Sequence, residues 1–414
     1  MAGSEGGGIW GISLTLMNST IMSNAAGTSG GGIYGGGAIA NSTVSGNIAQ
    51  NGGGIHDGAF CNNIITIANS TISGNRASGD GGGIYYSDIC NTKMRLSSVT
   101  VTNNASDSDG NETGNGGGIL SSGSMITLAN TIVAGNFDNS PIIKYPECDG
   151  TIGSEGYNLI LTVSPTCLIV GDTTGNIIGV NPNLAPLADN GGPTPTHALW
   201  PGNPAVDNGD PNGCVDDTGI SLTVDQRGYA RSMDGNSDGF AHCDIGAFEL
   251  GLNTALAPIL ASTIIYTDAQ GNPTSISVPT GAVTETATLV YSSVYSETPP
   301  AGYAFSGHAF ALDVYKNGMR LDSFTFQKPI TITIKYSDAD INGLDEAGLT
   351  LMYLDGTIWV DAATTCTPPS SYVRDLANNG LATAVCHLSD FALFGPAIEP
   401  IEYRVYLPIV LRNR

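Results

Sequence analysis

Two short segments of the chain carry side-chain oxygens at the spacing of calcium-binding loops. In such a loop, oxygens at positions one, three and five surround the cation, and a glycine makes the sharp turn. The first segment has Asp234, Asn236 and Asp238 at these positions. Its position twelve is Ile245 instead of glutamate, so Asp244 would have to close the loop. The segment predicts a calcium site, and the alternative is a solvated turn of Asp, Asn and Gly residues.

The second segment repeats this spacing with Asp338, Asp340 and Asn342, and two further acids, Asp345 and Glu346, follow it. It allows the same two interpretations, a calcium site or a solvated turn. Calcium is the only cofactor that the sequence suggests. The five histidines are scattered without metal-ligand spacing; they are His56, His197, His242, His308 and His387.

The eight cysteines fall into neighbouring pairs. An even number at short separations, without a C-x-x-C pattern, is typical of disulfides and not of zinc or redox sites. We therefore expect an extracellular or cell-surface protein. The predicted pairs are Cys61 with Cys90, Cys148 with Cys167, Cys214 with Cys243, and Cys366 with Cys386.

A repeated sequence motif organises the first part of the chain. A glycine run ending in isoleucine recurs five times and is followed each time by an Asn-rich segment. The isoleucines are Ile9, Ile33, Ile55, Ile84 and Ile119, so successive differences are 24, 22, 29 and 35 residues. Periods of this length indicate a solenoid, a propeller or an array. Cys61 and Cys90 each follow a glycine-run isoleucine by six residues, which predicts a separation of roughly 4.8 Å on adjacent coils.

The segments between the glycine runs alternate apolar and polar residues, as in Ile65-Thr66-Ile67, which is the period of a β-strand. A single short strand cannot bury its apolar face, so it must stack on the strand of the next repeat. We therefore predict an all-β fold with a parallel β-helix. The asparagines that recur once per coil predict an inward-facing amide ladder at the bends; they are Asn18, Asn41, Asn69 and Asn130.

Four segments after the repeats form a recognisable set: Asp189-Asn190-Gly191-Gly192-Pro193-Thr194, Thr196-His197-Ala198-Leu199, Asp225-Gln226-Arg227-Gly228 and Cys243-Asp244-Ile245-Gly246-Ala247-Phe248-Glu249. This set resembles the choice-of-anchor Q domain of secreted bacterial β-helix proteins, and the repeats resemble those of chlamydial polymorphic membrane proteins. The resemblance covers residues 1–250. It implies a right-handed solenoid at the cell exterior, often attached to the surface, and no reaction. From the residues alone, we expect Asp225 and Arg227 to pair where the last coil ends, and Phe248 to cover its apolar end.

The sequence divides into four parts. Residues 1–140 are the regular coils, 141–250 the irregular coils and terminal cap, 251–395 a C-terminal antiparallel β-sandwich, and 396–414 a tail. The third part is loosely similar to the sandwich shared by zonula occludens proteins and netrin receptors, which implies protein interaction. The tail segment YRVYLPIVLRNR is interpreted either as a sorting or docking tail or as a final strand against the sandwich.

Composition limits the partners. Lys and Arg total 14 and Asp and Glu total 37, a net charge of −23, and such a chain repels nucleic acid because phosphate binding requires basic patches. No stretch has the ~18 apolar residues of a membrane span. The chain opens in mid-repeat, so we expect a fragment or mature form whose first coil has a bare edge. Such an edge would allow head-to-tail self-association.

Many β-helices are carbohydrate-active enzymes, which need bases and acids in one groove. The bases in the regular coils are Arg76, Lys93 and Arg95, and the candidate acids are Asp57, Asp80 and Asp88. A solvated outer face explains these residues, and we expect no catalytic set. The predicted function is that of an adhesin-like stalk in a surface or structural protein, with rows of Thr, Ser and Asn that bind glycans or proteins. The alternative is a polysaccharide lyase on a pectin-lyase-like β-helix.

Overall fold

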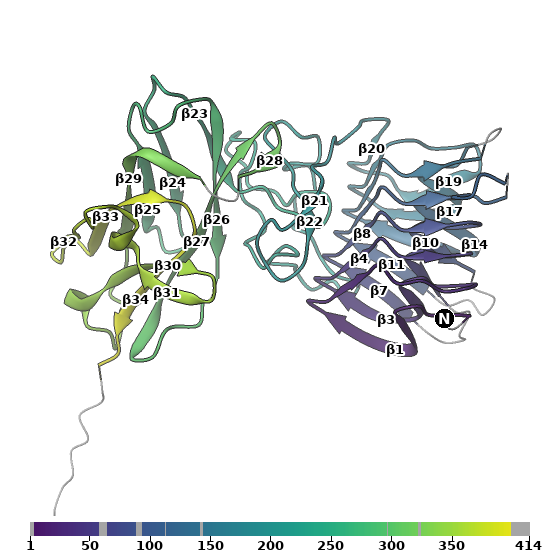
Figure 1. Ribbon diagram of the computed structural model, residues 1–414, viewed down its shortest axis with the longest axis horizontal. Coiled ribbons are helices and arrows are strands. Elements are labelled where there is room, and N and C mark those ends of the chain that lie inside the picture. Colours follow the sequence, from purple (N-terminus) through teal and green to yellow (C-terminus); the bar gives the residue numbers. More distant parts are fainter. Residues whose placement is uncertain are drawn as a thin grey trace, which may run out of the picture.

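The computed structural model describes residues 4–57, 64–87, 93–111, 113–140, 144–295, 297–321 and 324–398. The first part of the chain forms parallel sheets and the last part antiparallel sheets (Figure 1). The predicted all-β class is confirmed. Among the described residues, no helix is long and apolar enough to cross a membrane.

The largest sheet of the first part has nine parallel strands. Its glycine-run isoleucines are paired in register, Ile33 with Ile55, Ile55 with Ile84 and Ile84 with Ile119. The hydrogen-bonded path closes on itself, because β3 pairs with both β6 and β7, and β14 with both β10 and β11. The strands are β1 (Ile9–Met17), β3 (Ile33–Ala40), β6 (Ile55–His56), β7 (Ile64–Ala68), β10 (Ile84–Tyr86), β11 (Lys93–Ser97), β14 (Ile119–Ala129), β17 (Cys148–Glu155) and β19 (Cys167–Asp172).

Two smaller parallel sheets complete this part, which we call the parallel stack. One contains β2 (Thr20–Met22), β4 (Thr43–Ser45), β8 (Thr71–Ser73), β12 (Thr100–Thr102), β15 (Ile132–Val133), β18 (Leu159–Ile160) and β20 (Ile177–Ile178). The other contains β5 (Ile48–Ala49), β9 (Arg76–Ala77), β13 (Ala105–Ser106) and β16 (Phe137–Asp138). Each regular repeat thus passes through three sheets before the next repeat begins.

The glycine runs are explained by how closely successive repeats approach. A Cβ atom on Gly53 would lie 2.4 Å from the carbonyl oxygen of Arg76, and one on Gly54 would lie 2.6 Å from that of Gly83. A larger residue at either position would push the backbones apart. Inside the stack, Ile33, Ile55 and Ile84 are fully buried, and each such side chain contributes about 2 kcal/mol through burial.

An asparagine ladder runs through the buried interior of the stack. The Nδ2 atom of Asn47 donates to Oδ1 of Asn75, Asn75 to Asn104, and Asn104 to Asn136, each at 2.9 Å. Asn136 in turn donates to Oε2 of Glu147 at 2.7 Å. The backbone N–H of each asparagine donates to the same acceptor, so these buried polar groups are bonded.

The predicted ladder row was wrong. The residues Asn18, Asn41, Asn69 and Asn130 have φ values from 44° to 49°, and they lie at the corners because asparagine tolerates the left-handed region. Two of them bond to a later segment instead of to each other. Asn69 donates to the carbonyl of Val224 at 2.8 Å, and Oδ1 of Asn130 accepts from the N–H of Asp210 at 2.8 Å.

Residues 181–250 form an irregular segment with one short strand pair, β21 (Leu187–Ala188) and β22 (Thr196–His197). It lies along the side of the stack: Gln226 bonds to Thr71 at 2.7 Å and to Thr43 at 2.9 Å. Phe248 packs in a cluster with Ile132, on a strand well before the last coil. The expectation that Phe248 covers the end of the stack was therefore wrong.

The last part has two antiparallel sheets that share one hydrophobic core. The first contains β23 (Leu252–Leu256), β26 (Ala287–Val294), β27 (Tyr303–Lys316), β34 (Asp390–Pro396), β30 (Thr350–Asp355) and β31 (Ile358–Asp361), with β28 (Met319–Arg320) on β27. The second contains β24 (Ser262–Thr267), β25 (Pro273–Val278), β29 (Thr325–Lys335), β33 (Gly380–His387) and β32 (Val373–Asp375). Two short 3-10 helices, η1 (Glu346–Gly348) and η2 (Ala362–Thr365), lie between strands. This part lies beside the stack, with residues 181–250 between them (Figure 1).

The ladder predicts a large loss of stability for the substitution Asn75→Ala. This change removes the acceptor of Asn47 and the donor to Asn104, and it leaves buried groups unbonded. We expect the free energy of unfolding to fall by about 3 kcal/mol, measured by urea denaturation. Asn139→Ala, at an exposed asparagine of the same stack, should change it by less than about 0.5 kcal/mol. Equal losses would contradict the ladder.

Glu147 predicts a pH dependence of stability. Burial raises its pKa to about 7, although the side chain and N–H of Asn136 and the N–H of Gly135 oppose the rise. The folded state therefore holds this proton more tightly than the unfolded state, and stability falls as pH rises from about 5 to 8. Relative to the wild type, Glu147→Gln should gain on the order of 3 kcal/mol on going from pH 5 to pH 8.

The measurement is urea denaturation at several pH values. Asp109→Asn, at an exposed acid of the same stack, should leave the wild-type dependence in place. A Glu147→Gln protein with the same slope as the wild type would show that Glu147 does not titrate in this range.

Candidate functional site

A groove of about 850 Å³ crosses the nine-stranded sheet over β7, β11, β14 and β17, and residues 217–219 form its far wall. We call it the lateral groove. Its floor repeats from strand to strand, because Arg95 is paired in register with Thr66 on one side and Thr127 on the other. Two exposed apolar side chains, Ile64 and Met125, also line it. The groove thus combines a row of hydrogen-bonding side chains, two threonines with an arginine between them, with apolar surface.

Two basic residues of the groove differ in their contacts. Arg95 is held in place, since its guanidinium pairs with the carboxylate of Glu155 and donates to the carbonyl of Asp216. Lys93 is exposed on the same strand. Asp80 does not line the groove: its Oδ1 atom accepts from the N–H of Asn115 at 2.9 Å, and burial raises its pKa despite that bond. Lys93 and Asp80 are therefore not brought together.

The first predicted calcium segment forms a turn. Oδ1 of Asp234 accepts from the N–H of Asp238 at 3.1 Å, and Oδ1 of Asn236 accepts from the same N–H at 2.8 Å. Asp244, the residue predicted to close the loop, is buried elsewhere. Its two oxygens accept from the N–H groups of Asp207 at 2.7 Å and Leu250 at 2.6 Å. The first three residues are brought together, and Asp244 does not join them.

The side chains of the second predicted calcium segment have different partners. Oδ1 of Asp338 accepts from Nδ2 of Asn379 at 2.8 Å, whereas Asp340 faces His308. Asn342 lies in the same loop and its N–H donates to the carbonyl of Ala339 at 3.4 Å. Asp338 and Asp340 thus bind different partners, and this calcium site, like the first, stays a prediction.

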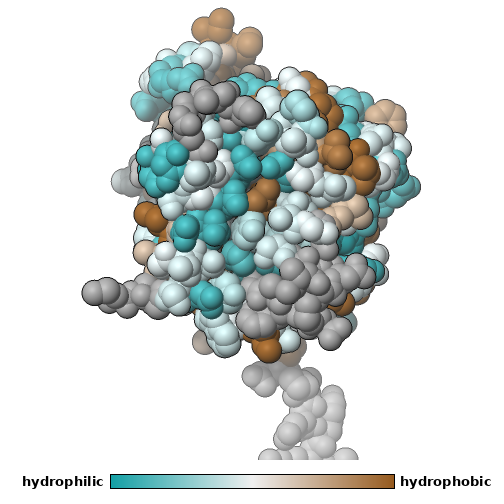
Figure 2. Space-filling model, turned by 90° about the vertical axis from the view of Figure 1, so that its right-hand side faces the viewer, coloured by the Kyte–Doolittle hydropathy of each residue, from teal (hydrophilic) through white to brown (hydrophobic). Residues whose placement is uncertain are grey.

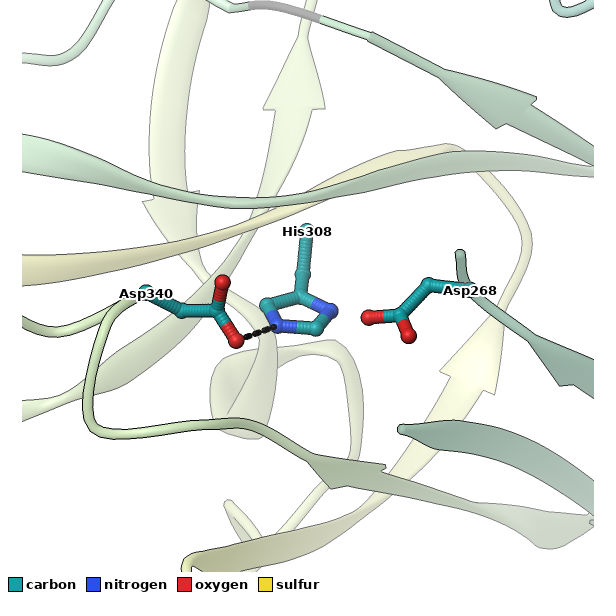
Figure 3. A group of neighbouring side chains, drawn as sticks. All are labelled: Asp268, His308 and Asp340. Carbon is teal, nitrogen blue, oxygen red and sulfur yellow. Dashed lines mark ion pairs between the residues drawn. The ribbon is translucent and has the colours of Figure 1, made fainter. Parts of the chain in front are cut away.

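Asp340 belongs to a group that the sequence did not reveal, consisting of Asp268, His308 and Asp340 (Figure 3). One ligand atom from each residue lies within 4.8 Å of the others. We call it the His308 cluster. The three residues come from the β24–β25 turn, from β27 and from the loop after β29, so their spacing in the sequence gave no signal.

Burial opposes ionisation of Asp340, but the N–H and hydroxyl of Ser337 and the nearby His308 outweigh it, and the pKa of Asp340 lies below its ordinary value. The carboxylate is therefore negatively charged at neutral pH.

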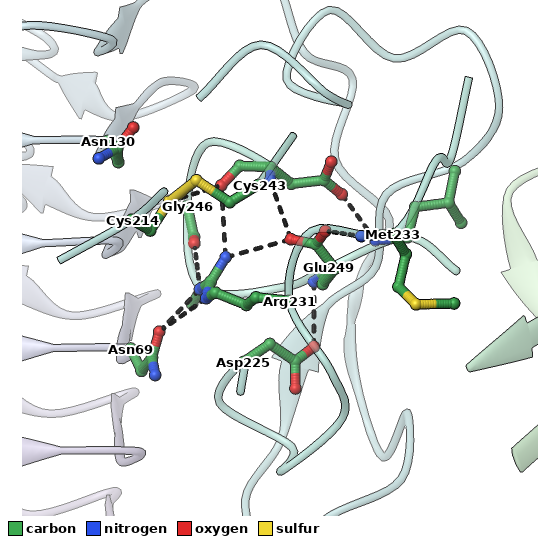
Figure 4. Close-up of polar contacts among 12 residues, drawn as sticks. Asn69, Asn130, Cys214, Asp225, Arg231, Met233, Cys243, Gly246 and Glu249 are labelled. Atoms are coloured by element: carbon green, nitrogen blue, oxygen red, sulfur yellow. Dashed lines mark hydrogen bonds and ion pairs between the residues drawn. A yellow bond between two sulfur atoms is a disulfide. The ribbon is translucent and has the colours of Figure 1, made fainter. Parts of the chain in front are cut away.

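A buried polar network, which we call the clasp, joins residues 181–250 to the stack (Figure 4). Nη2 of Arg231 donates to Oδ1 of Asn69 at 2.7 Å and to the carbonyl of Gly246 at 2.8 Å. Nη1 of Arg231 lies 3.4 Å from Oε2 of Glu249. The N–H of Asp244 donates to the same Oε2 at 2.8 Å. Burial is the largest influence on Glu249 and Asp244 and raises the pKa of both carboxyls.

The clasp also contains Asp225 and Arg227. Their predicted pairing is confirmed, with an Arg227 Nη2 to Asp225 Oδ2 distance of 2.8 Å, but the predicted place was wrong, because the neighbouring Gln226 bonds to Thr71 and Thr43 along the side of the stack. Arg227 lies 3.6 Å above the ring of Phe248 and donates to the carbonyl of Glu249 at 2.5 Å. The hydrogen bonds and ion pairs of these side chains all go to other protein groups, so we interpret the clasp as structural.

Three predicted disulfides are confirmed. Cys148–Cys167 joins β17 to β19, Cys214–Cys243 lies next to the clasp, and Cys366–Cys386 joins the end of η2 to β33. Their Cα–Cα distances are 5.5, 6.1 and 5.1 Å. The predicted pair of Cys61 and Cys90 lies outside the described residues, as does the tail segment from Tyr403 to Arg414.

Neither the protein-family models nor the curated proteins give a match to this chain. The resemblance to surface-anchored solenoids therefore has no support from these comparisons, and function has to be argued from the geometry.

The clasp predicts that Arg231→Met is strongly destabilising. The substitution approximately keeps the length of the side chain, removes the positive charge beside Glu249, and takes the Arg231 donor away from Asn69 and the carbonyl of Gly246. We expect a loss of about 3–5 kcal/mol, measured by guanidinium chloride denaturation. Arg76→Met, at an exposed arginine on β9, should cost less than about 0.5 kcal/mol. Similar losses for both variants would show that the buried arginine contributes no more than a surface one.

Proposed function

We propose that the protein is an extracellular surface protein in which a right-handed parallel β-helix forms a stiff stalk, a β-sandwich adjoins it, and the lateral groove binds an extended glycan. The three disulfides are compatible with an oxidising compartment. Wound, stacked strands bury one continuous core and provide a long regular surface. The choice-of-anchor resemblance fits the same location.

The row of paired side chains across the lateral groove carries this proposal. Thr66, Arg95 and Thr127 follow one another on adjacent strands, with a spacing of roughly 4.8 Å. One sugar unit of an extended polysaccharide advances by a similar length, so successive sugars would each meet a hydrogen-bonding side chain of this row. The apolar surface of Ile64 and Met125 suits the nonpolar face of a sugar ring.

The charges of the groove favour an uncharged glycan. Lys93 and Arg95 are balanced by Glu155 and Asp217, all of which line the groove. The chain as a whole carries −23 charges, which repels a polyuronate at low ionic strength. On the opposite side of the molecule from the antiparallel sheets, hydrophilic and hydrophobic residues are interspersed (Figure 2).

Head-to-tail association of the stack is part of this proposal. At one end β1 and β2 are the outermost strands of their sheets, and at the other end β19 and β20 are. Exposed apolar side chains lie at both ends, for example Met17 and Leu168. A second copy that places β19 against β1 would continue both parallel sheets through a heterologous contact.

The glycan proposal predicts saturable binding of a neutral polysaccharide in affinity electrophoresis, with uronate-rich polysaccharides retarded less. Lys93→Ala and Thr66→Val should each weaken binding at least about tenfold, the loss of one or two hydrogen bonds. Lys144→Ala, at an exposed lysine outside the groove, should bind as the wild type does.

Retardation that is unchanged in both groove variants would refute the assignment to the groove. Release of new reducing or unsaturated ends from any polysaccharide, abolished by Lys93→Ala, would instead support the lyase alternative, because Lys93, Arg95 and Glu155 supply a base and an acid in one groove.

A further inference from the structure

We propose that the His308 cluster binds a divalent transition-metal ion of the zinc type through His308, Asp268 and Asp340. The proposal is independent of the glycan-binding function, because the cluster lies in the antiparallel sheets and the lateral groove in the parallel stack. Imidazole nitrogen with two carboxylate oxygens is a ligand set that suits such ions.

The distances within the cluster fit ligands of one ion. Two ligands of a tetrahedral zinc ion, each about 2.1 Å from the metal, are about 3.4 Å apart. Nε2 of His308 lies 3.4 Å from Oδ2 of Asp340. One ligand atom from each of the three residues lies within 4.8 Å of the others, so binding of one ion by all three requires side-chain rotation from this spacing.

One ring nitrogen of His308 is buried without a hydrogen bond within the described part of the chain. The side chain of His308 is only 8% exposed, and its Nε2 atom has no hydrogen-bond partner among the described residues. An unsatisfied buried ring nitrogen costs free energy unless something binds it. Figure 3 shows the ring between the carboxylates of Asp268 and Asp340, with one ring nitrogen turned toward each of them.

The backbone around His308 aims its side chain into the cluster. The pairing of β27 with β34 shifts register between Phe305 and Ala309, and Gly307 has a φ of 86°. A bulge of this kind redirects a side chain that regular pleating would place elsewhere. His308 lies within the bulge, one residue after Gly307.

Asn272 links the two carboxylates of the cluster. Nδ2 of Asn272 lies 3.1 Å from Oδ2 of Asp268 and 3.4 Å from Oδ2 of Asp340, so one amide donates to both carboxylates. Rotation of this amide by half a turn would present its oxygen to a metal. A cavity of about 320 Å³ adjoins the cluster, and none of its lining residues is Lys or Arg. It leaves room for a water or an anionic ligand in the remaining metal position.

The ligand set also favours zinc over calcium. Calcium takes six to eight oxygen ligands and does not favour nitrogen, and the cluster offers one ring nitrogen with few oxygens.

Isothermal titration of the full chain with Zn²⁺, after removal of any affinity tag, tests the proposal. We expect one ion per chain and an increase in the melting temperature on binding. His308→Gln and Asp268→Asn should each weaken binding at least about tenfold. Ca²⁺ in excess should not displace Zn²⁺.

Two variants serve as matched controls. Asp338→Asn removes an acid two residues from Asp340 that faces Asn379, and His242→Gln removes an imidazole outside the cluster. Both should bind Zn²⁺ as the wild type does. The melting curve of each metal-free variant shows that it is folded, and Asn272→Ala, which leaves the ligands in place, should lower affinity less than the ligand variants do.

Three results would overturn the proposal. One is the absence of saturable one-to-one binding in the wild type at millimolar Zn²⁺. Another is unchanged affinity in folded His308→Gln, and the third is binding of Ca²⁺ that displaces Zn²⁺ without dependence on His308.

Discussion

The parallel stack depends on one constraint. The buried asparagine side chains must hydrogen-bond from each repeat to the next. Each asparagine of the ladder accepts two bonds from one neighbour and donates to the next, so the ladder has a direction. It ends on Glu147, whose carboxylate accepts from the side chain and N–H of Asn136 and from the N–H of Gly135. Carboxyl oxygens accept hydrogen bonds, so the side chain of Glu147 is a chemically suitable end for a row of donors.

The ladder in turn requires glycine on the adjacent strand. A Cβ atom on Gly54 would lie 2.9 Å from Nδ2 of Asn75, and the equivalent position, Gly83, would meet Asn104 in the same way. The glycine run of one repeat therefore packs directly against the ladder asparagine of another, as Gly54 does against Asn75. This explains why both halves of the repeated phrase keep the same register despite coils of unequal length.

Sequence reasoning predicted the parallel strands, three of the disulfides and the Asp225–Arg227 pair, because each follows from repetition or from short separation. It assigned the ladder to the wrong set of asparagines. Corners with positive φ and buried ladders both favour asparagine, and both kinds of position recur once per repeat, so repetition alone does not distinguish a corner asparagine from a ladder asparagine. It also assigned Asp244 to a calcium loop from its distance along the chain. Burial among backbone N–H groups removes this side chain from the loop. The His308 cluster depends on three strands or turns that meet only after folding, so no spacing rule could have found it.

The clasp shows how an acidic protein places its few basic residues. Arg227 and Arg231 are buried with three acids, Asp225, Asp244 and Glu249, which leaves one excess negative charge if all are ionised. A buried unpaired charge is costly, and burial together with the nearby Glu249 raises the pKa of Asp244. Both arginines also bond to backbone carbonyls. The same segment contacts the antiparallel sheets, where Tyr229 bridges to Val294, so the clasp ties the stack to the sheets that carry the His308 cluster.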